Sequence, residues 1–277
     1  MTPFVGMLFA AGAALALQAT APLPQARRHF ESVREGCFLL KDLRTDAVES
    51  FNPERCSRPF SPCSTFKIPN ALIGLETGVL TGPDHLMTWD GTRSEREVTN
   101  RDHTLRSAME HSVVWYFQRV ASGIGKERMR RHLATIGYGN QDLSGGLTRF
   151  WLGSSLAISA EEQLAFMERL AEGDLPFSSG ALDAVRTILV LRSDGGAVLR
   201  GKTGSGRGDP DDLGWFVGYL TNPDGAWAFA CNVSGRGAFG TRARSIVEAV
   251  LEERGLLPRA AGPSEAREGP TGEPAPR

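Results

Sequence analysis

The stretch that decides the fold of this chain is Pro62-Cys63-Ser64-Thr65-Phe66-Lys67-Ile68-Pro69-Asn70. It places a serine three residues before a lysine, and side chains at positions i and i+3 meet on one face of a helix. A serine hydroxyl becomes an effective nucleophile only when a base takes its proton. Ser64 and Lys67 therefore predict acyl transfer through a covalent serine intermediate. The four letters alone also fit an ordinary helix start, with the serine as N-cap and the lysine in water.

The composition is typical of a globular protein. The chain has 277 residues, of which 41% are hydrophobic and 23% charged, and its net charge is −1. This length is enough for one large domain with a sizeable core. The balanced charge gives no electrostatic reason to expect a nucleic acid or an anionic membrane as partner.

The cysteines and histidines show no zinc-binding spacing, so we expect no metal. If the protein is exported from the cytoplasm, its cysteines could form disulfides. The pairing stays open, because four cysteines allow three arrangements and also fit buried free thiols. They are Cys37, Cys56, Cys63 and Cys231.

Two terminal segments stand apart from the expected catalytic domain, residues 22–257. Residues 1–21 predict a secretory signal peptide, because the apolar run 4–17 is short for a membrane span and Ala19-Thr20-Ala21 resembles a cleavage site. No Lys or Arg precedes the run, and a buried N-terminal helix is the alternative. Residues 258–277 hold five prolines and no large apolar side chain, which predicts a disordered tail.

The hydrophobic pattern predicts strands at both ends of the chain and helices in its middle. The β-type segments are 37–43, 47–51, 198–204, 214–220 and 226–233. The expected helices include 64–78, 126–136, one that begins with a capping box at Ser159 and a last one that ends at Gly255. We therefore expect an α+β fold. Its terminal segments share one central antiparallel sheet flanked by helices, and a helical lobe is inserted between them.

Further motifs follow the Ser-x-x-Lys pair in a fixed order: Ser112-Val113-Val114, Tyr138-Gly139-Asn140, Phe150-Trp151-Leu152 and Lys202-Thr203-Gly204. The last combines a positive charge, a hydroxyl and a backbone without Cβ, which suits holding a carboxylate-bearing, peptide-like substrate against a strand. Ser-x-x-Lys early, a serine element in the middle and Lys-Thr-Gly late is the order of class A β-lactamases and penicillin-binding proteins, although the middle element here is not Ser-Asp-Asn.

With these motifs and their flanks, roughly residues 30–256 resemble a class D (oxacillinase-type) serine β-lactamase, of the penicillin-recognising serine hydrolases and transferases. The resemblance implies hydrolysis of the β-lactam amide of penicillin-type antibiotics through an acyl-enzyme on Ser64. It also implies that Lys67 is carbamylated (N6-carboxylysine) by CO₂ or bicarbonate and serves as base in acylation and deacylation. Trp151 would bind the carbamate and Val114 would shield it from water.

The physical basis is that a free lysine is protonated at neutral pH, whereas burial favours the neutral amine that adds CO₂. The Glu-x-x-x-Asn loop that class A enzymes use for deacylation is absent from this chain, which leaves Lys67 as the candidate base.

The resemblance assigns the remaining site residues as well. Ser112 would relay a proton to the lactam nitrogen and Lys202 would polarise that relay. Thr203, Gly204 and Ser205 would bind substrate, with the backbone N–H groups of Ser64 and Ser205 as oxyanion donors. An arginine near the last helix would bind the substrate carboxylate. Arg242 is our choice over Arg244, and two solvated arginines are the alternative.

Two other functions remain possible at this stage. One is a β-lactam sensor domain or penicillin-binding protein that stays acylated, and the other is a catalytically silent binding module on the same fold. Sensors of this type carry transmembrane helices, which favours the hydrolase. We expect β-lactam substrates as the only partners, a monomer or homodimer, and export to the bacterial periplasm. The preferred β-lactams are left open.

Overall fold

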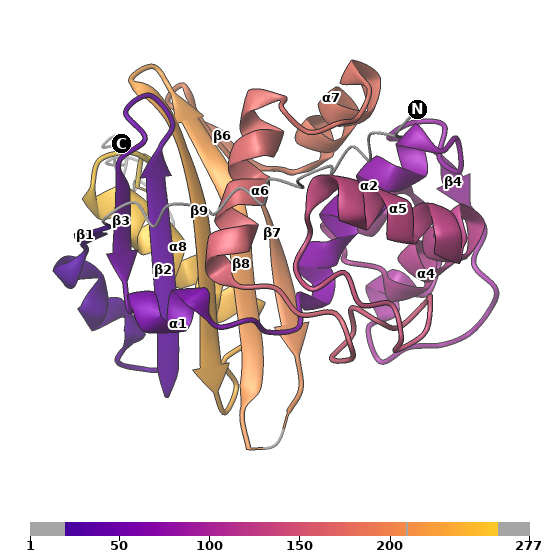
Figure 1. The fold of residues 1–277 in the computed structure, drawn as a ribbon, viewed down its shortest axis with the longest axis horizontal. Helices are drawn as coiled ribbons and strands as arrows, with labels where there is room; N and C mark the ends of the chain where they lie inside the picture. The colour runs from indigo at the N-terminus through magenta and orange to yellow at the C-terminus, as the bar shows by residue number, and fades with distance from the viewer. Residues whose placement is uncertain (1–19, 209, 260–277) are drawn as a thin grey trace, which may run out of the picture.

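The computed structural model describes residues 20–208 and 210–259, and a seven-stranded sheet forms its centre (Figure 1). The spatial order of the strands is β1 (Ala21–Pro22), β3 (Val48–Phe51), β2 (Glu35–Asp42), β9 (Gly225–Gly235), β8 (Asp212–Asn222), β7 (Ala197–Gly206) and β6 (Val190–Asp194). All neighbours pair antiparallel except β1 and β3. The early and late segments therefore share one sheet, and the predicted α+β fold is confirmed.

Helices cover both faces of this sheet. One face carries α6 (Ala160–Glu172) and α1 (Pro53–Ser57), and the other carries α8 (Gly240–Glu253) and the 3₁₀ helix η1 (Pro24–Phe30). Strand β9 shows why: Ala228 and Ala230 belong to the core on the α6 side, whereas Phe229 and Cys231 belong to the core on the α8 side. The alternation of small and large residues in β9 thus matches a sheet buried on both faces.

The helical lobe lies beside the sheet, at the right of Figure 1. It contains the 3₁₀ helices η2 (Cys63–Phe66) and η3 (Glu97–Thr99), the helices α2 (Lys67–Glu76), α3 (Leu105–Glu110), α4 (Val114–Ile124), α5 (Lys126–Ile136) and α7 (Ser179–Ile188), and the short strands β4 (Leu86–Met87) and β5 (His103–Thr104). Helix α2 packs against α4 and α7. This places the residues that follow Ser64 in the centre of the lobe.

The expected helix over residues 64–78 divides at Lys67. Its first turn is the 3₁₀ helix η2, and the α-helical part ends one residue before Thr77, with Gly78 at φ 72°. Pro69 explains the division, because its missing N–H is tolerated only in the first turn of an α-helix. The predicted capping box is confirmed: Ser159 Oγ accepts from Glu162 N at 3.1 Å, and Glu162 Oε2 accepts from Ser159 N at 2.8 Å.

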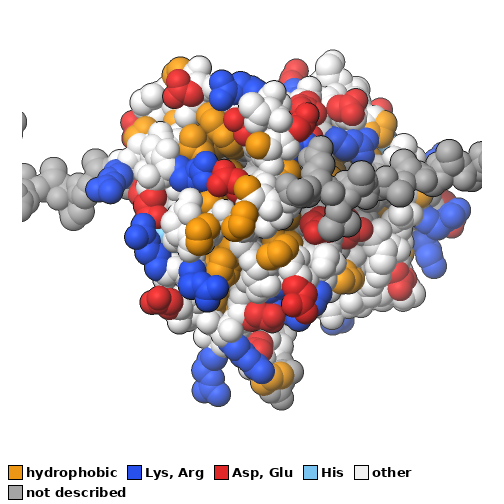
Figure 2. Space-filling model, turned by 60° about the vertical axis from the view of Figure 1, so that its left-hand side comes forward, with side chains coloured by type: hydrophobic (Ala, Val, Ile, Leu, Met, Phe, Trp, Pro, Cys, Tyr) orange, Lys and Arg blue, Asp and Glu red, His pale blue; other side chains and the backbone are white. Residues whose placement is uncertain are grey.

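The expected leader and tail lie almost wholly outside the described residues. Among the helices of 20–208 and 210–259, none is long and apolar enough to cross a bilayer. Positive and negative side chains alternate over the face turned to the viewer in Figure 2, so this face carries no field of a single sign.

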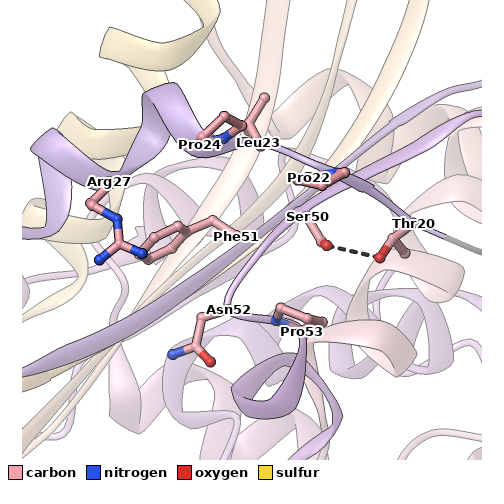
Figure 3. A pocket seen from close by; sticks show the side chains of 9 residues that line it. All are labelled: Thr20, Pro22, Leu23, Pro24, Arg27, Ser50, Phe51, Asn52 and Pro53. Carbon is pink, nitrogen blue, oxygen red and sulfur yellow. Dashed lines mark hydrogen bonds between the residues drawn. The ribbon is translucent and has the colours of Figure 1, made fainter.

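A hollow of about 520 Å³ lies at the β1 edge of the sheet (Figure 3). Ser50 Oγ donates to Thr20 Oγ1 across it at 2.9 Å, and Phe51 and Arg27 line it. None of the residues predicted for catalysis lines this hollow. It is therefore separate from the chemistry indicated by the sequence.

The turn Tyr138-Gly139-Asn140 depends on its glycine, and two matched substitutions measure this. Gly139 has φ 54°, and a Cβ there would meet Ala157 O at 2.2 Å, whereas Gly137 has φ 65° with open space around it. Gly137→Ala should cost about 1–2 kcal/mol of backbone strain. Gly139→Ala should cost about 1–3 kcal/mol more, because the methyl group is overpacked. Urea unfolding of both variants checks this, and equal losses would contradict the close approach.

Candidate active site

The start of the helical lobe brings Ser64 and Lys67 together. Ser64 lies in η2, Lys67 is the first residue of α2, and Lys67 Nζ is 2.6 Å from Ser64 Oγ. Cys63, just before the serine, has φ 51°, a left-handed conformation that is uncommon for a residue with a side chain. Such strain persists only where the surroundings enforce it, and it clusters at functional sites. The serine is thus presented on a constrained turn with an amine in contact.

Lys67 is fully buried, with 0% of its surface exposed. Burial, and secondly the charge of Lys202, hold the pKa of Lys67 well below its usual value of 10.5. The Phe117 ring centroid lies 5.7 Å from Lys67 Nζ. Burial therefore favours the neutral amine of Lys67 far more than water does for an exposed lysine.

Trp151, which stacks on Phe66 next to Lys67 in the chain, has an unsatisfied buried donor. Trp151 is 0% exposed and stacks on Phe66 at 5.1 Å, while its Nε1 has no hydrogen-bond partner among the described residues. A buried N–H without an acceptor costs about 1–3 kcal/mol. An additional acceptor group on Lys67 would fit this donor. Val114, the expected shield, begins α4 and is 39% exposed, whereas Val113 is buried.

Ser112 and Lys202 form a second pair. Ser112 lies between α3 and α4 with φ 54°, and Lys202 Nζ donates to Ser112 Oγ at 3.1 Å and to Thr203 O at 3.1 Å. Burial, and secondly the charge of Arg96, lower the pKa of Lys202 to about 7. A group with that pKa exchanges protons readily at neutral pH. Ser112 is thus held against a proton donor.

The Lys-Thr-Gly motif lies on a free strand edge. Strand β6 pairs with β7 only as far as Arg200, and no described strand pairs with residues 202–206 on that side. A Cβ on Gly204 would lie 2.8 Å from Pro62 O and 3.3 Å from Ser64 N. Only glycine therefore lets β7 approach the serine turn so closely. Ser205 Oγ accepts from Gly240 N at 3.0 Å, which ties this edge to the start of α8.

The two candidate arginines of α8 lie differently. A cavity of about 520 Å³ is lined by Lys202, Thr203 and Arg244, together with Arg106 and Glu110 of α3. Arg242 is exposed and does not line it. Arg244 Nε also donates to Glu248 Oε1 at 2.7 Å. The structure thus brings Arg244, rather than the preferred Arg242, next to the Lys-Thr-Gly strand.

A buried polar chain that the sequence analysis missed supports the serine turn. Tyr138 OH donates to Gln163 Oε1 at 3.3 Å, Gln163 Nε2 donates to Thr65 Oγ1 at 2.8 Å, and Thr65 Oγ1 donates to Pro62 O at 2.8 Å. Gln163 stands on the inward face of α6, between Ala160 and Met167. A polar residue in this apolar stripe is the signal that would have identified it.

Ser61 connects the serine turn to two other segments. Its Oγ donates to Trp151 O at 3.1 Å and accepts from Gly153 N at 3.0 Å. Its carbonyl accepts from Trp215 Nε1 at 2.9 Å. The loop that carries Trp151 is thereby fixed to the turn that carries Ser64.

The cysteines are free and buried, all four of them. His103 is also buried, and Ser107 Oγ and Val98 O lie 2.9 and 3.1 Å from its ring nitrogens. Within 20–208 and 210–259, no group of His, Cys, Asp and Glu side chains is arranged to hold a metal ion.

Comparisons with known proteins agree with this geometry. Residues 26–252 match the penicillin binding protein transpeptidase domain. "Probable beta-lactamase YbxI" of Bacillus subtilis (strain 168) is 42% identical over 80% of this chain and 82% of that protein. A solved class D β-lactamase from Bacillus subtilis is 40% identical, with a TM-score of 0.81 over 84% of this chain and 97% of that one. "Regulatory protein BlaR1" of Bacillus licheniformis is 34% identical over 80% of this chain but only 37% of that protein.

The burial of Lys67 predicts that Lys67→Met stabilises the fold. Removing a buried amine with one polar contact should add about 1–3 kcal/mol at pH 7. Because the pKa is lower in the folded than in the unfolded chain, the unfolded state binds more protons between the two values. Wild-type stability therefore rises with pH in this window, and the advantage of Lys67→Met shrinks as the pH approaches 10.5.

Urea unfolding in CO₂-free buffer at pH 7 and pH 9 measures this. Lys126→Met, at an exposed position of α5, is the matched control and should change little at either pH. A Lys67→Met variant less stable than wild type at pH 7 would show that burial of the amine is not costly.

Proposed function

The chain belongs to the penicillin-binding-protein transpeptidase family and, within it, to the class D serine β-lactamases, and from that membership we propose that it hydrolyses the β-lactam amide of penicillin-type antibiotics through an acyl-enzyme on Ser64. The observation that carries this proposal is the 2.6 Å contact between Ser64 Oγ and the buried Lys67 Nζ. The nucleophile and its base are in hydrogen-bond contact before any substrate binds.

We propose that Lys67 carries a carbamate formed from CO₂ or bicarbonate. Two features fit it: the lowered pKa of Lys67 favours the neutral amine that adds CO₂, and the buried Nε1 of Trp151 lacks an acceptor. When present, the carbamate supplies an anionic base where a bare lysine would supply only an amine. Val114 would limit the access of water to it.

In acylation, Ser64 Oγ bonds to the lactam carbonyl carbon as its proton passes to the side chain of Lys67. Backbone N–H groups of Ser64 and Ser205 would hold the oxyanion, each donor contributing about 3 kcal/mol. The lactam C–N bond then breaks, Ser112 Oγ gives its proton to the nitrogen, and Lys202 restores that proton. The 3.1 Å contact between Lys202 and Ser112 supports this relay. Lys67 passes the proton it took on to Lys202, which resets both groups. It then takes a proton from the water that cleaves the ester and gives this proton to Ser64 Oγ as the ester C–O bond breaks.

Substrate binding is proposed for the free edge of β7. Thr203 and the backbone at Gly204 and Ser205 would hold the ligand as an added strand, with Lys202 attracting its carboxylate. Arg242 remains the sequence-based proposal for direct carboxylate binding. The cavity beside Lys202 favours Arg244 in that role.

A second candidate function is a β-lactam sensor or penicillin-binding protein that stays acylated, which the similarity to BlaR1 favours. Both functions need Ser64, so they differ only in deacylation. We also propose that residues 1–21 direct export to the periplasm, that residues 22–257 form the catalytic domain and that residues 258–277 form a disordered tail, as their composition predicts.

The first experiment follows hydrolysis of a chromogenic cephalosporin. We expect sustained turnover that is lost in Ser64→Ala and that falls when CO₂ is removed at mildly acidic pH and returns with bicarbonate. A ¹³C signal from labelled bicarbonate should appear on wild-type protein and vanish in Lys67→Ala. One stoichiometric burst without turnover would establish the sensor instead.

Lys67→Ala tests the base in both halves of the reaction. Because Lys67 is the proposed base in acylation and in deacylation, its loss should slow both steps, deacylation by at least ~10³-fold, so that any Ser64 acyl-enzyme that forms persists. Intact-protein mass spectrometry after mixing with a penicillin measures the adduct over time. Wild-type turnover in this variant would rule out Lys67 as the deacylation base.

A further inference from the structure

Two large apolar side chains of strand β6 are exposed beside the Lys-Thr-Gly strand. Val190 is 41% exposed and Leu191 is 37% exposed, and in the described part of the chain only two other large apolar side chains are exposed to this extent. Both line the cavity of about 520 Å³ that is also lined by Lys202, Thr203 and Arg244. Apolar side chains that gather in a hollow, rather than standing singly on a surface, indicate a binding surface.

A β-bulge explains how two consecutive residues come to line one cavity. Val190 pairs with Arg200 of β7 and Arg192 pairs with Leu199, so Leu191 is an extra residue without a partner. In a regular strand, consecutive side chains point to opposite faces, and one of the two would face away from the cavity. A bulge breaks this alternation and redirects a side chain, and bulges are frequent beside active sites.

The pairing of β6 with β7 fixes the bulge next to Lys202. Gly201 N donates to Leu189 O at 3.0 Å, and Gly201 directly precedes Lys202. The bulge follows Leu189 by two residues, so it lies where the free edge of β7 begins. Ile188 of α7 and Met109 of α3 line the same cavity. Its apolar lining therefore comes from three elements and does not depend on β6 alone.

The polar lining of the cavity is mainly cationic. Lys202, Arg244 and Arg106 line it, together with one acidic side chain, Glu110. A volume of about 520 Å³ is in the range of small-molecule sites and far exceeds that of a single carboxylate. The cavity therefore suits a ligand that carries an anionic group and an apolar group close together.

We propose that Val190 and Leu191 are specificity residues that bind an apolar substituent on the ring carbon next to the carboxylate of the β-lactam. This inference rests on the proposed function, because a carboxylate near Lys202 directs its neighbouring ring carbon into the cavity. The ligand class is a cephalosporin-type β-lactam with a large apolar group at that carbon. A small group such as methyl would leave the two side chains in contact with water.

Acylation of Ser64 by two cephalosporins tests this, with intact-protein mass spectrometry as readout. The compounds share one acyl side chain and differ only at the carbon next to the carboxylate-bearing one, which carries methyl or styryl. Wild type should reach half-maximal acylation at an about 10- to 30-fold lower concentration of the styryl compound, the factor expected for burying roughly 50–80 Å² of apolar surface. The double variant Val190→Thr/Leu191→Thr should reduce this preference by about 3- to 10-fold, because threonine suits a strand but removes apolar contact. Its limiting acylation rate should stay unchanged.

Leu86→Thr is the matched control, because Leu86 is an exposed leucine of the short strand β4 and does not line this cavity. It should keep the wild-type preference, whereas Val190→Thr and Leu191→Thr alone should each lose part of it. The inference is wrong if the double variant keeps the wild-type preference, or if both compounds weaken equally, which would indicate a structural role. Because acylation is measured, the result does not depend on turnover. Absence of any Ser64 adduct in wild type would contradict the proposed function and this inference with it.

Discussion

The structure depends on the burial of one amine, Lys67. A lysine with no exposed surface loses the hydration that keeps it charged, and within the described part of the chain its one side-chain hydrogen bond is to Ser64. The Phe117 ring lies 5.7 Å from the amine, and the preceding residue, Phe66, stacks on Trp151. Burial that would be a defect elsewhere is what lets this side chain act as a base. The fold therefore carries a local instability that the two cores on either side of the sheet must offset.

Two turns of the site have strained backbone, and contacts between distant segments hold them. Cys63 and Ser112 have left-handed backbone conformations although neither is a glycine. Cys63 immediately precedes Ser64, and Ser112 itself carries the second hydroxyl group of the site. Neither conformation is stable alone, at about 1–3 kcal/mol each. The close approach of Gly204 and the buried chain through Thr65 and Gln163 hold the serine turn. Contact between Lys202 and Ser112 does the same for the second turn. Precise placement thus comes from contacts between distant segments.

This explains how far the sequence alone could predict the molecule. The expected bounds of helix α5 agree with the observed ones because glycines flank its apolar stripe. The observed strands β7 and β9 are a few residues longer than the expected segments, because pairing with β8 extends them. Two-residue strands such as β1 have no local pattern to recognise. At the site, the motif residues were enough to predict which side chains would take part in the chemistry. The choice between Arg242 and Arg244 depended on the rotation of α8. Gln163 interrupts the apolar stripe of α6, but its partners Thr65 and Tyr138 are set by long-range packing that no local pattern encodes.

Burial sets the charge of Lys202 as well as that of Lys67. Burial, and secondly the charge of Arg96, lower the pKa of Lys202 to about 7. A lysine with that pKa changes its protonation state readily near neutral pH, and any anion placed beside it shifts it towards the charged form. A carboxylate-bearing substrate would therefore favour protonated Lys202, which supplies the proton that Ser112 passes to the leaving nitrogen. Binding of the carboxylate therefore also protonates the lysine that supplies the relay. Acidic β-lactams would be favoured through the reaction rate as well as through affinity.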